Sequence, residues 1–161
     1  KVGEDIPALE RRGNVDVLRR PAETLDTDPD TDEARLNVLM VAIGTFAESA
    51  CAIADELATE GIDLTVVDPR WVIPVAAELV EMAAEADLVV VYEDGLLRGG
   101  VGSAVAEALH AAGVDTPLRQ LAFPSVYPEH ASRDEVLAEY GLDQESAASQ
   151  VRQWALELAD R

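Results

Sequence analysis

The stretch Leu88-Val-Val-Val-Tyr-Glu-Asp-Gly-Leu-Leu-Arg-Gly-Gly-Val-Gly-Ser-Ala-Val-Ala-Glu-Ala-Leu109 decides the fold. It opens with an apolar run from Leu88 to Tyr92, which is typical of a buried strand, and that run ends in two acids. A glycine-punctuated turn follows, and then an alanine-rich helical pattern begins. A strand, a turn and a helix in one unit predict an α/β domain.

The same alternation of strand and helix continues on both sides of this stretch. The expected strands cover residues 15–20, 37–43, 64–67, 88–92 and 117–123, of which 15–20 is weak and 117–123 is a half-polar edge. The expected helices cover residues 45–60, 74–85, 101–112 and 132–140, with a last one from 143 onward. Three strong strands separated by helices predict a parallel βαβ core with right-handed crossovers and helices on both faces.

Short sequence signals predict where several of these helices begin. Thr45 with Glu48 has the spacing of a capping box, and so does Ser132 with Glu135. Pro74 is expected to open the helix that follows it, since proline is favoured at the first helical position. Asp143 is expected to cap the last helix.

Composition limits the class of protein. The chain has 161 residues, enough for one domain, and its net charge of −20 comes from 32 acids and 12 bases. Such a surface repels phosphate backbones and anionic lipid, so nucleic-acid and membrane partners are not expected. Cys51 is the only cysteine, which fits a reducing cytoplasm, and no apolar run reaches the roughly 18 residues of a membrane helix.

The domain organisation follows from local composition. Residues 1–13 are polar and interrupted by Gly and Pro, and we expect an N-terminal linker there, followed by one domain over residues 14–161. An acidic loop, residues 21–35, interrupts that domain. The chain starts without Met in this linker-like segment, which predicts a piece cut from a longer protein.

Most catalytic signatures are absent from the sequence. His110 and His130 are the only histidines and fall on different elements, so no metal site is expected. The dinucleotide-binding fingerprint, the P-loop and the Gly-x-Ser-x-Gly elbow are all missing. The residues therefore predict neither a complete catalytic centre nor a metal or cofactor site.

The glycine turn is the first candidate site. Gly99, Gly100 and Gly102 permit close backbone approach, and Gly102 and Ser103 begin a helix whose free N–H groups favour an anion or a partner's carboxylate. Arg98 adds positive charge beside them. The alternative is that these glycines serve only a tight turn and close packing of helix on sheet.

Polar residues at strand ends are the other candidates. Glu93 and Asp94 end a strand at its carboxyl edge, where α/β sheets place function, although they would equally serve as caps or ion-pair partners. Arg70 ends the neighbouring strand, where a structural pair with Asp68 is the simpler expectation. His130 lies in a loop before a helix and is a weaker candidate.

Several of these motifs occur together in one known family. Val67-Asp68-Pro69-Arg70-Trp71-Val72-Ile73-Pro74 combines with Glu93-Asp94 and with Gly99-Gly100-Val101-Gly102-Ser103. The segments 2–7, 38–45, 130–133 and 141–142, and Trp154, add to the match, which excludes only the acidic residues 26–33. In this combination the chain resembles the C-terminal domain of the 1-deoxy-D-xylulose-5-phosphate synthases, thiamine-diphosphate enzymes of the transketolase superfamily.

The resemblance implies a fold and an activity. It implies a three-layer α/β/α domain with a five-stranded mixed sheet, whose first strand runs antiparallel to the others. For the parent enzyme it implies that pyruvate loses CO2 and is joined to D-glyceraldehyde 3-phosphate. The product, 1-deoxy-D-xylulose 5-phosphate, enters the methylerythritol phosphate route to isoprenoids and is a precursor of thiamine and pyridoxal.

The resemblance also implies what this part of the enzyme lacks. Thiamine diphosphate and Mg²⁺ belong to the N-terminal domain and the activating glutamate to the middle domain, so no cofactor is expected on this chain alone. The domain is expected to support the active site and a homodimer, with Glu93, Arg98, Gly99, Gly100, Gly102, Ser103, Arg70 and His130 as candidates for facing other domains or an anion. The alternatives are another thiamine enzyme, namely a 2-oxoacid dehydrogenase β subunit or a transketolase, and a non-catalytic assembly module.

Overall fold

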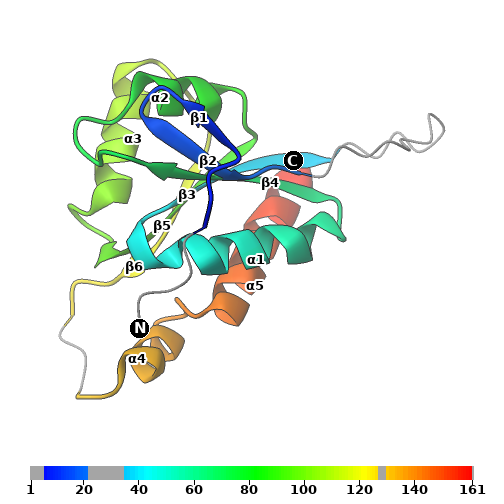
Figure 1. Ribbon diagram of the computed structural model, residues 1–161. Helices are drawn as coiled ribbons and strands as arrows, with labels where there is room; N and C mark the ends of the chain where they lie inside the picture. Colours follow the sequence, from blue (N-terminus) through cyan, green and yellow to red (C-terminus); the bar gives the residue numbers. More distant parts are fainter. Residues whose placement is uncertain (1–5, 22–34, 127–129, 161) are drawn as a thin grey trace.

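A mixed sheet flanked by helices forms the protein. The computed structural model describes residues 6–21, 35–126 and 130–160 (Figure 1). The strands are β1 (Glu10–Arg12), β2 (Val15–Arg19), β3 (Leu36–Ala42), β4 (Ile62–Pro69), β5 (Leu88–Leu96) and β6 (Leu118–Phe123). The helices are α1 (Ala47–Ala58), α2 (Ala77–Ala84), α3 (Val101–Ala111), α4 (Arg133–Glu139) and α5 (Gln144–Ala159), and a 3-10 turn, η1 (Gly44–Phe46), precedes α1.

The sheet has the order β1-β2-β4-β3-β5-β6. Strands β4, β3, β5 and β6 are parallel, whereas β2 runs antiparallel to β4 and β1 antiparallel to β2. The antiparallel first strand of the expected fold is therefore confirmed as β2. The sheet has six strands rather than five, because Glu10–Arg12, expected within the linker, pairs with Val15–Val17 as a short hairpin at the edge.

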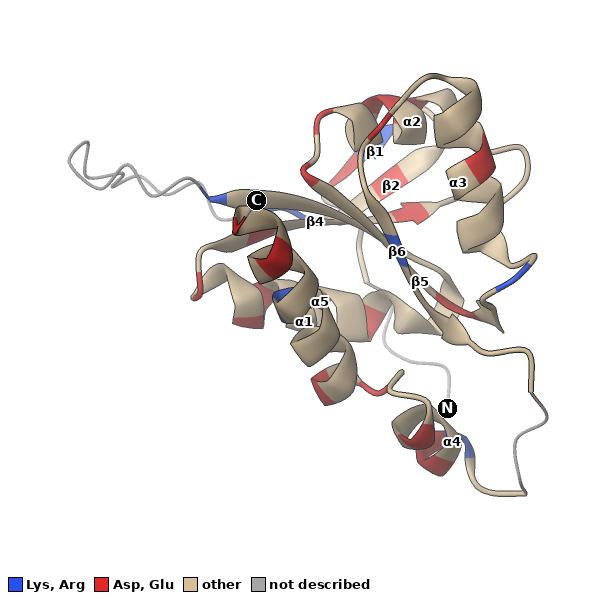
Figure 2. Ribbon diagram, turned by 180° about the vertical axis from the view of Figure 1, so that it is seen from behind, with Lys and Arg blue, Asp and Glu red and all other residues tan. Residues whose placement is uncertain are grey.

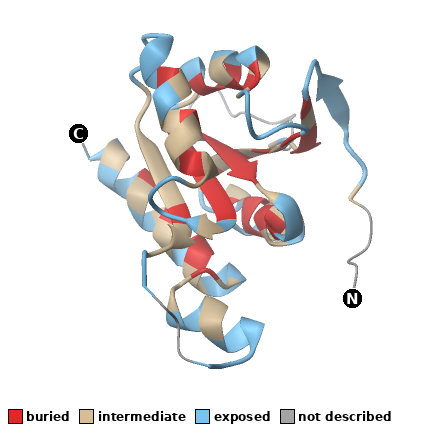
Figure 3. Ribbon diagram, turned by 90° about the vertical axis from the view of Figure 1, so that its left-hand side faces the viewer, coloured by how far each residue is buried: buried red, intermediate tan, exposed pale blue. Residues whose placement is uncertain are grey.

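Alternating side chains of the central strands fill two cores, one on each face of the sheet. Val38 and Met40 of β3 face α1 and α5, whereas Leu39 and Val41 face α2 and α3. Buried residues accordingly concentrate on the central strands and on the helix faces turned toward them (Figure 3). This confirms the three-layer α/β/α architecture. No helix in the described ranges is long and apolar enough to cross a membrane.

The predicted helix starts are partly confirmed. Ser132 and Glu135 form a complete capping box at α4, and Asp143 accepts from the Ser146 N–H at the start of α5. The predicted Thr45 cap is wrong, since residues 44–46 form η1 and no side chain caps α1. Pro74 does not open a helix either, because α2 begins at Ala77 after an irregular segment.

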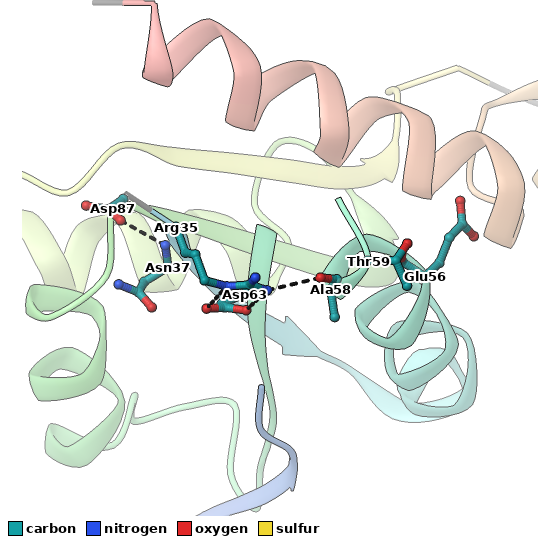
Figure 4. A network of polar contacts seen from close by, with 7 residues as sticks. All are labelled: Arg35, Asn37, Glu56, Ala58, Thr59, Asp63 and Asp87. Carbon is teal, nitrogen blue, oxygen red and sulfur yellow. Dashed lines mark hydrogen bonds and ion pairs between the residues drawn. The ribbon is translucent and has the colours of Figure 1, made fainter. Parts of the chain in front are cut away.

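An ion pair braces the amino-terminal edge of the parallel strands (Figure 4). Arg35 Nε and Nη2 donate to the two carboxylate oxygens of Asp63 at 2.8 and 2.6 Å, and Nη2 also donates to the Ala58 carbonyl at the end of α1 at 3.0 Å. Nearby, Asp87 accepts from the Asn37 N–H at 2.8 Å. These contacts fix the edge of the sheet that lies opposite the candidate site.

Candidate functional site

A cleft of about 510 Å³ opens at the carboxyl edge of the sheet. The strands β3 and β5 are neighbours in the sheet, but the loop after β3 leads to α1 on one face and the loop after β5 leads to α3 on the other. The cleft lies between these two loops, at the topological switch point of the sheet. Open α/β sheets bind ligands and partners at this kind of position. The lining residues are Ile43, Gly44, Thr45, Ile73, Glu93, Asp94, Gly95, Gly99, Gly100 and Val101.

Glu93 is the buried charge of this site. Its side chain is only 2% exposed, and its two oxygens accept from the N–H groups of Val101 and Gly102, each at 2.8 Å. These are the first N–H groups of α3, which have no partner within the helix and carry the positive end of its dipole. Glu93 therefore supplies an anion to the α3 N-terminus from within the chain, and these two donors are engaged.

The glycines make room for this carboxylate. A Cβ on Gly95 would come within 2.3 Å of Glu93 Oε2, and one on Gly100 within 2.6 Å of the same atom. A Cβ on Gly102 would meet the Gln120 side chain of β6 at 2.5 Å. The predicted close approach of helix and sheet is thus present. The absence of a side chain at Gly95 leaves room for the Glu93 carboxylate, and at Gly100 it leaves room for both that carboxylate and the Leu96 carbonyl oxygen.

Ser103 closes the turn before α3. Its Oγ accepts from the Gly99 N–H at 2.9 Å and donates to the Leu97 carbonyl at 3.3 Å. Gly99 has φ +80°, in the left-handed region that favours glycine. Arg98, at the tip of this turn, is exposed, and no ion pair to it occurs among the described residues. The turn is therefore held by its own hydrogen bonds while Arg98 faces outward.

Arg133 ties α4 to the same edge. Its guanidinium pairs with the Asp94 carboxylate, donates to Thr45 Oγ1 at 3.1 Å, and lies 5.9 Å from the centre of the Phe46 ring. Asp94 lies near the carboxyl end of β5, and Thr45 and Phe46 follow β3, so one side chain joins α4 to the ends of two neighbouring strands. This arginine is not among the residues predicted from the sequence, because its partners are 39 and 88 residues away in the chain.

Tyr92 links the site to the helices at the end of the chain. It is fully buried, its ring stacks on Phe46 with centroids 3.9 Å apart, and its hydroxyl donates to the Leu142 carbonyl. Burial raises the pKa of the Tyr92 phenol above its ordinary value, and the nearby Asp143 charge acts in the same direction. The hydroxyl therefore stays protonated and serves as a structural donor.

Arg70 lies outside the cleft and has a different partner from the one expected. It donates to Asp16 Oδ2 at 3.2 Å, on β2, and no pair with Asp68 is present in the described ranges. Arg11 also binds Asp16, and this hydrogen bond is the main reason why the pKa of Asp16 falls below its ordinary value. Burial raises the pKa of Asp68, and the Asp16 charge opposite raises it further.

The cleft brings together only part of the predicted set. Glu93, Gly99 and Gly100 line it, whereas Gly102 and Ser103 stand behind it at the α3 N-terminus. Arg98, Arg70 and His130 are exposed and are not among the lining residues. Thr45 and the exposed Trp71-Val72-Ile73 also belong to this edge, although they are not among the site residues predicted from the sequence. A run of three large apolar residues between a strand and a proline is a signal that could have identified that segment.

The residues of this edge do not fit the diphosphate or the metal of a thiamine enzyme. A phosphate group needs free donors, but the N–H groups of Val101 and Gly102 at the α3 N-terminus bind Glu93. The net charge of −20 also opposes an anion, and Asp and Glu recur on several helices and strands in the view of Figure 2. Within the described residues, no three His, Cys, Asp or Glu side chains are grouped so as to hold a metal ion.

The sequence matches one protein-family model and several curated proteins. The family is described as transketolase, C-terminal domain, and its model matches residues 30–146. 1-Deoxy-D-xylulose-5-phosphate synthase of Mycobacteroides abscessus is 47% identical over 99% of this chain, and that of Mycolicibacterium gilvum is 49% identical over 98%. The synthase of Mycobacterium tuberculosis H37Rv is 48% identical over 98% of the chain. The chain spans 23% of the length of each of these relatives.

A solved structure agrees with the fold. A chain described as a split gene transketolase, inactive beta4 tetramer, superposes with a TM-score of 0.68 and 32% identity. The similarity covers 77% of this chain and 40% of that one. Family model, relatives and structure therefore point to the same part of the same superfamily.

Proposed function

Since the chain belongs to the transketolase C-terminal domain family, we propose that it is the C-terminal domain of a 1-deoxy-D-xylulose-5-phosphate synthase. The observation that carries this proposal is the identity of 47 to 49% to such synthases over nearly the whole chain. In the complete enzyme, pyruvate and D-glyceraldehyde 3-phosphate are condensed with loss of CO2. The product is 1-deoxy-D-xylulose 5-phosphate.

We propose that this domain itself takes no part in the bond-making steps. In support, the one buried carboxylate of its cleft is engaged as a helix cap, and the surrounding residues do not fit a diphosphate or metal. Thiamine diphosphate and Mg²⁺ would then be held by the N-terminal domain of the same polypeptide, with the activating glutamate on its middle domain. The role of this domain is to support their arrangement and the homodimer of an enzyme that we place in the cytoplasm.

Within that role, Glu93 and Ser103 act on the turn rather than on a ligand. Their hydrogen bonds hold residues 94–100 against the start of α3, so that the backbone at Arg98 has a fixed conformation. We retain Arg98 and the glycine turn as the candidates that face another domain. Arg70 is assigned to the β2–β4 contact with Asp16, and His130 remains a candidate by its exposure alone.

The proposal is tested with the full-length polypeptide that contains this chain. It is incubated with pyruvate, D-glyceraldehyde 3-phosphate, Mg²⁺ and thiamine diphosphate, and the product is identified by mass spectrometry. One deoxyxylulose phosphate for each CO2 supports the proposal. Transfer of a two-carbon unit from a ketose phosphate, without use of pyruvate, would assign the polypeptide to the transketolases instead.

A further inference from the structure

Exposed apolar side chains gather at one edge of this domain. In the described ranges, eight large hydrophobic residues are exposed, and six of them lie at the carboxyl ends of β4, β5 and β6 or in the loops that follow. The other two, Leu9 and Leu156, lie elsewhere. We call the six the carboxyl-edge patch: Trp71, Val72, Ile73, Leu96, Leu97 and Val126.

The patch adjoins the cleft, and Ile73 belongs to both. Ile73 lines the cleft from the β4 side and the glycine turn lines it from the β5 side, with the end of β3 between them. Leu96 pairs with Phe123 of β6, and the Leu97 N–H donates to the Phe123 carbonyl at 2.7 Å. The patch therefore has residues at the ends of β4, β5 and β6, and the end of β3 lies between its β4 and β5 parts.

This surface is preorganised for a partner. Trp71 is 66% exposed and Ile73 is 72% exposed. Removing large apolar side chains such as these from water lowers the free energy. The backbone that carries Leu96 and Leu97 is fixed by Glu93 and Ser103, so little conformational entropy is lost when it is covered. Contiguous exposed apolar residues mark interaction sites, and tryptophan and arginine dominate their energetics.

We propose that the carboxyl-edge patch is the surface against which the rest of the same polypeptide packs, an inference that rests on the proposed function. The chain spans 23% of its relatives' length, so more than three quarters of such a polypeptide lies outside it. The covering surface is apolar opposite Trp71 and Ile73. It also bears a carboxylate that pairs with Arg98.

Charge distinguishes this occupant from a second copy of the chain. A two-fold contact would place the same patch on both sides. The Asp94 carboxylate next to the patch is already paired with Arg133, so a second patch offers Arg98 no obvious partner. Two copies would also each bring a net charge of −20 to the contact. The rest of the polypeptide is a different surface, so the two-fold constraint does not apply to it and it is free to present a carboxylate to Arg98.

Hydroxyl-radical footprinting of the full-length polypeptide tests this directly. If nothing covers the patch, Trp71 stays 66% exposed, and it should oxidise at roughly that fraction of its rate in the denatured protein. The inference predicts that native Trp71 loses nearly all of its oxidation, at every protein concentration. Oxidation at the exposed rate overturns it, and so does protection that disappears when the oligomer dissociates on dilution, since a second copy is then the occupant.

Two matched leucine substitutions test whether the patch holds the covering surface in place in the same polypeptide. Leu97→Ser within the patch should restore oxidation of Trp71, whereas Leu156→Ser, at an exposed leucine of α5, should not. Arg98→Glu should act like Leu97→Ser. Equal behaviour of the two leucine variants overturns the inference. Synthase activity is measured in parallel: product formation with an unprotected Trp71 refutes only this inference, and a protected Trp71 without product refutes only the proposed function.

Discussion

The carboxylate of Glu93 occupies the space that a side chain on Gly100 would need. A Cβ at Gly100 would lie 2.6 Å from Oε2 and 2.8 Å from Oε1 of Glu93, and 2.3 Å from the Leu96 carbonyl oxygen. The backbone of Gly100, with φ −77° and ψ −172°, is one that any residue adopts, so this glycine is required by contact and not by conformation. The buried acid therefore packs against Gly100 at the point where its hydrogen bonds link β5 to the start of α3.

Gly100→Ala is therefore expected to destabilise the domain by about 1–3 kcal/mol, the usual cost of overfilling a packed site. Because part of the clash is with the Glu93 carboxylate, the same change should cost less in a Glu93→Ala background. A double-mutant cycle of chemical denaturation measures this coupling. Strictly additive free energies would show that the carboxylate and the glycine do not share the space.

Glu93→Gln tests the helix cap without changing its size. A glutamine offers one accepting oxygen instead of two, so one of the two buried N–H groups at Val101 and Gly102 loses its acceptor. We expect a loss of about 1–3 kcal/mol in the free energy of unfolding, the cost of an unsatisfied buried group. Glu107→Gln, on the exposed side of α3, is the control and should change stability by less than about 0.5 kcal/mol. Equal effects of the two substitutions would refute the capping role.

Tyr92→Phe tests the link between β5 and α5. The ring and its stacking on Phe46 stay, but the Leu142 carbonyl loses its donor. A loss of about 0.5–1.5 kcal/mol is expected, the net value of one hydrogen bond, with faster amide exchange at the start of α5. Tyr140→Phe is the control, since no hydrogen bond of its hydroxyl is found among the described residues. Exchange at α5 that is unchanged in Tyr92→Phe would contradict the assignment.

Asp68→Asn should stabilise the domain at neutral pH. Asp68 lies directly opposite Asp16 across the β2–β4 pair, and burial together with that charge raises its pKa in the folded state. A carboxyl group whose pKa is higher in the folded state than in the unfolded state lowers the free energy of unfolding when it is ionised. The gain from Asn is therefore greatest above the folded pKa, shrinks as the pH falls through it, and vanishes below the ordinary value of 3.8.

Denaturant titrations from neutral to acidic pH measure whether the stability gain from Asp68→Asn shrinks as the pH falls. Asp115→Asn, at an exposed position, serves as the control and should change stability by less than about 0.5 kcal/mol at each pH. A gain for Asp68→Asn that grows on acidification would contradict the prediction, because it would mean that the carboxylate is stabilised by folding.

Local patterns were sufficient to predict the layers of this fold. The apolar runs around Val38 and Val89 recur at strand spacing, and they form the parallel centre of the sheet. The Ser132 capping box is equally local and is confirmed. Thr45 has the same spacing relative to Glu48, but its hydroxyl accepts from Arg133, a partner that no local window contains.

The site was harder to predict because its partners are distant in the sequence. A glutamate at a strand end beside a glycine turn allows either an external anion or an internal cap, and only the three-dimensional distance between Glu93 and Gly102 decides between them. The apolar run Trp71-Val72-Ile73 before a proline marks this segment as a candidate, but the exposure of Trp71 does not follow from it, because a tryptophan in that position is compatible with burial. Contacts between elements, not local propensity, determine both features.

The most direct test of the account is reconstitution from two pieces. The synthase polypeptide lacking the residues of this chain is assayed with pyruvate, D-glyceraldehyde 3-phosphate, Mg²⁺ and thiamine diphosphate, before and after the separately folded chain is added. The account predicts that 1-deoxy-D-xylulose 5-phosphate forms only in the mixture, and that Arg98→Glu weakens this rescue. The absence of product from two folded, associated pieces would contradict it.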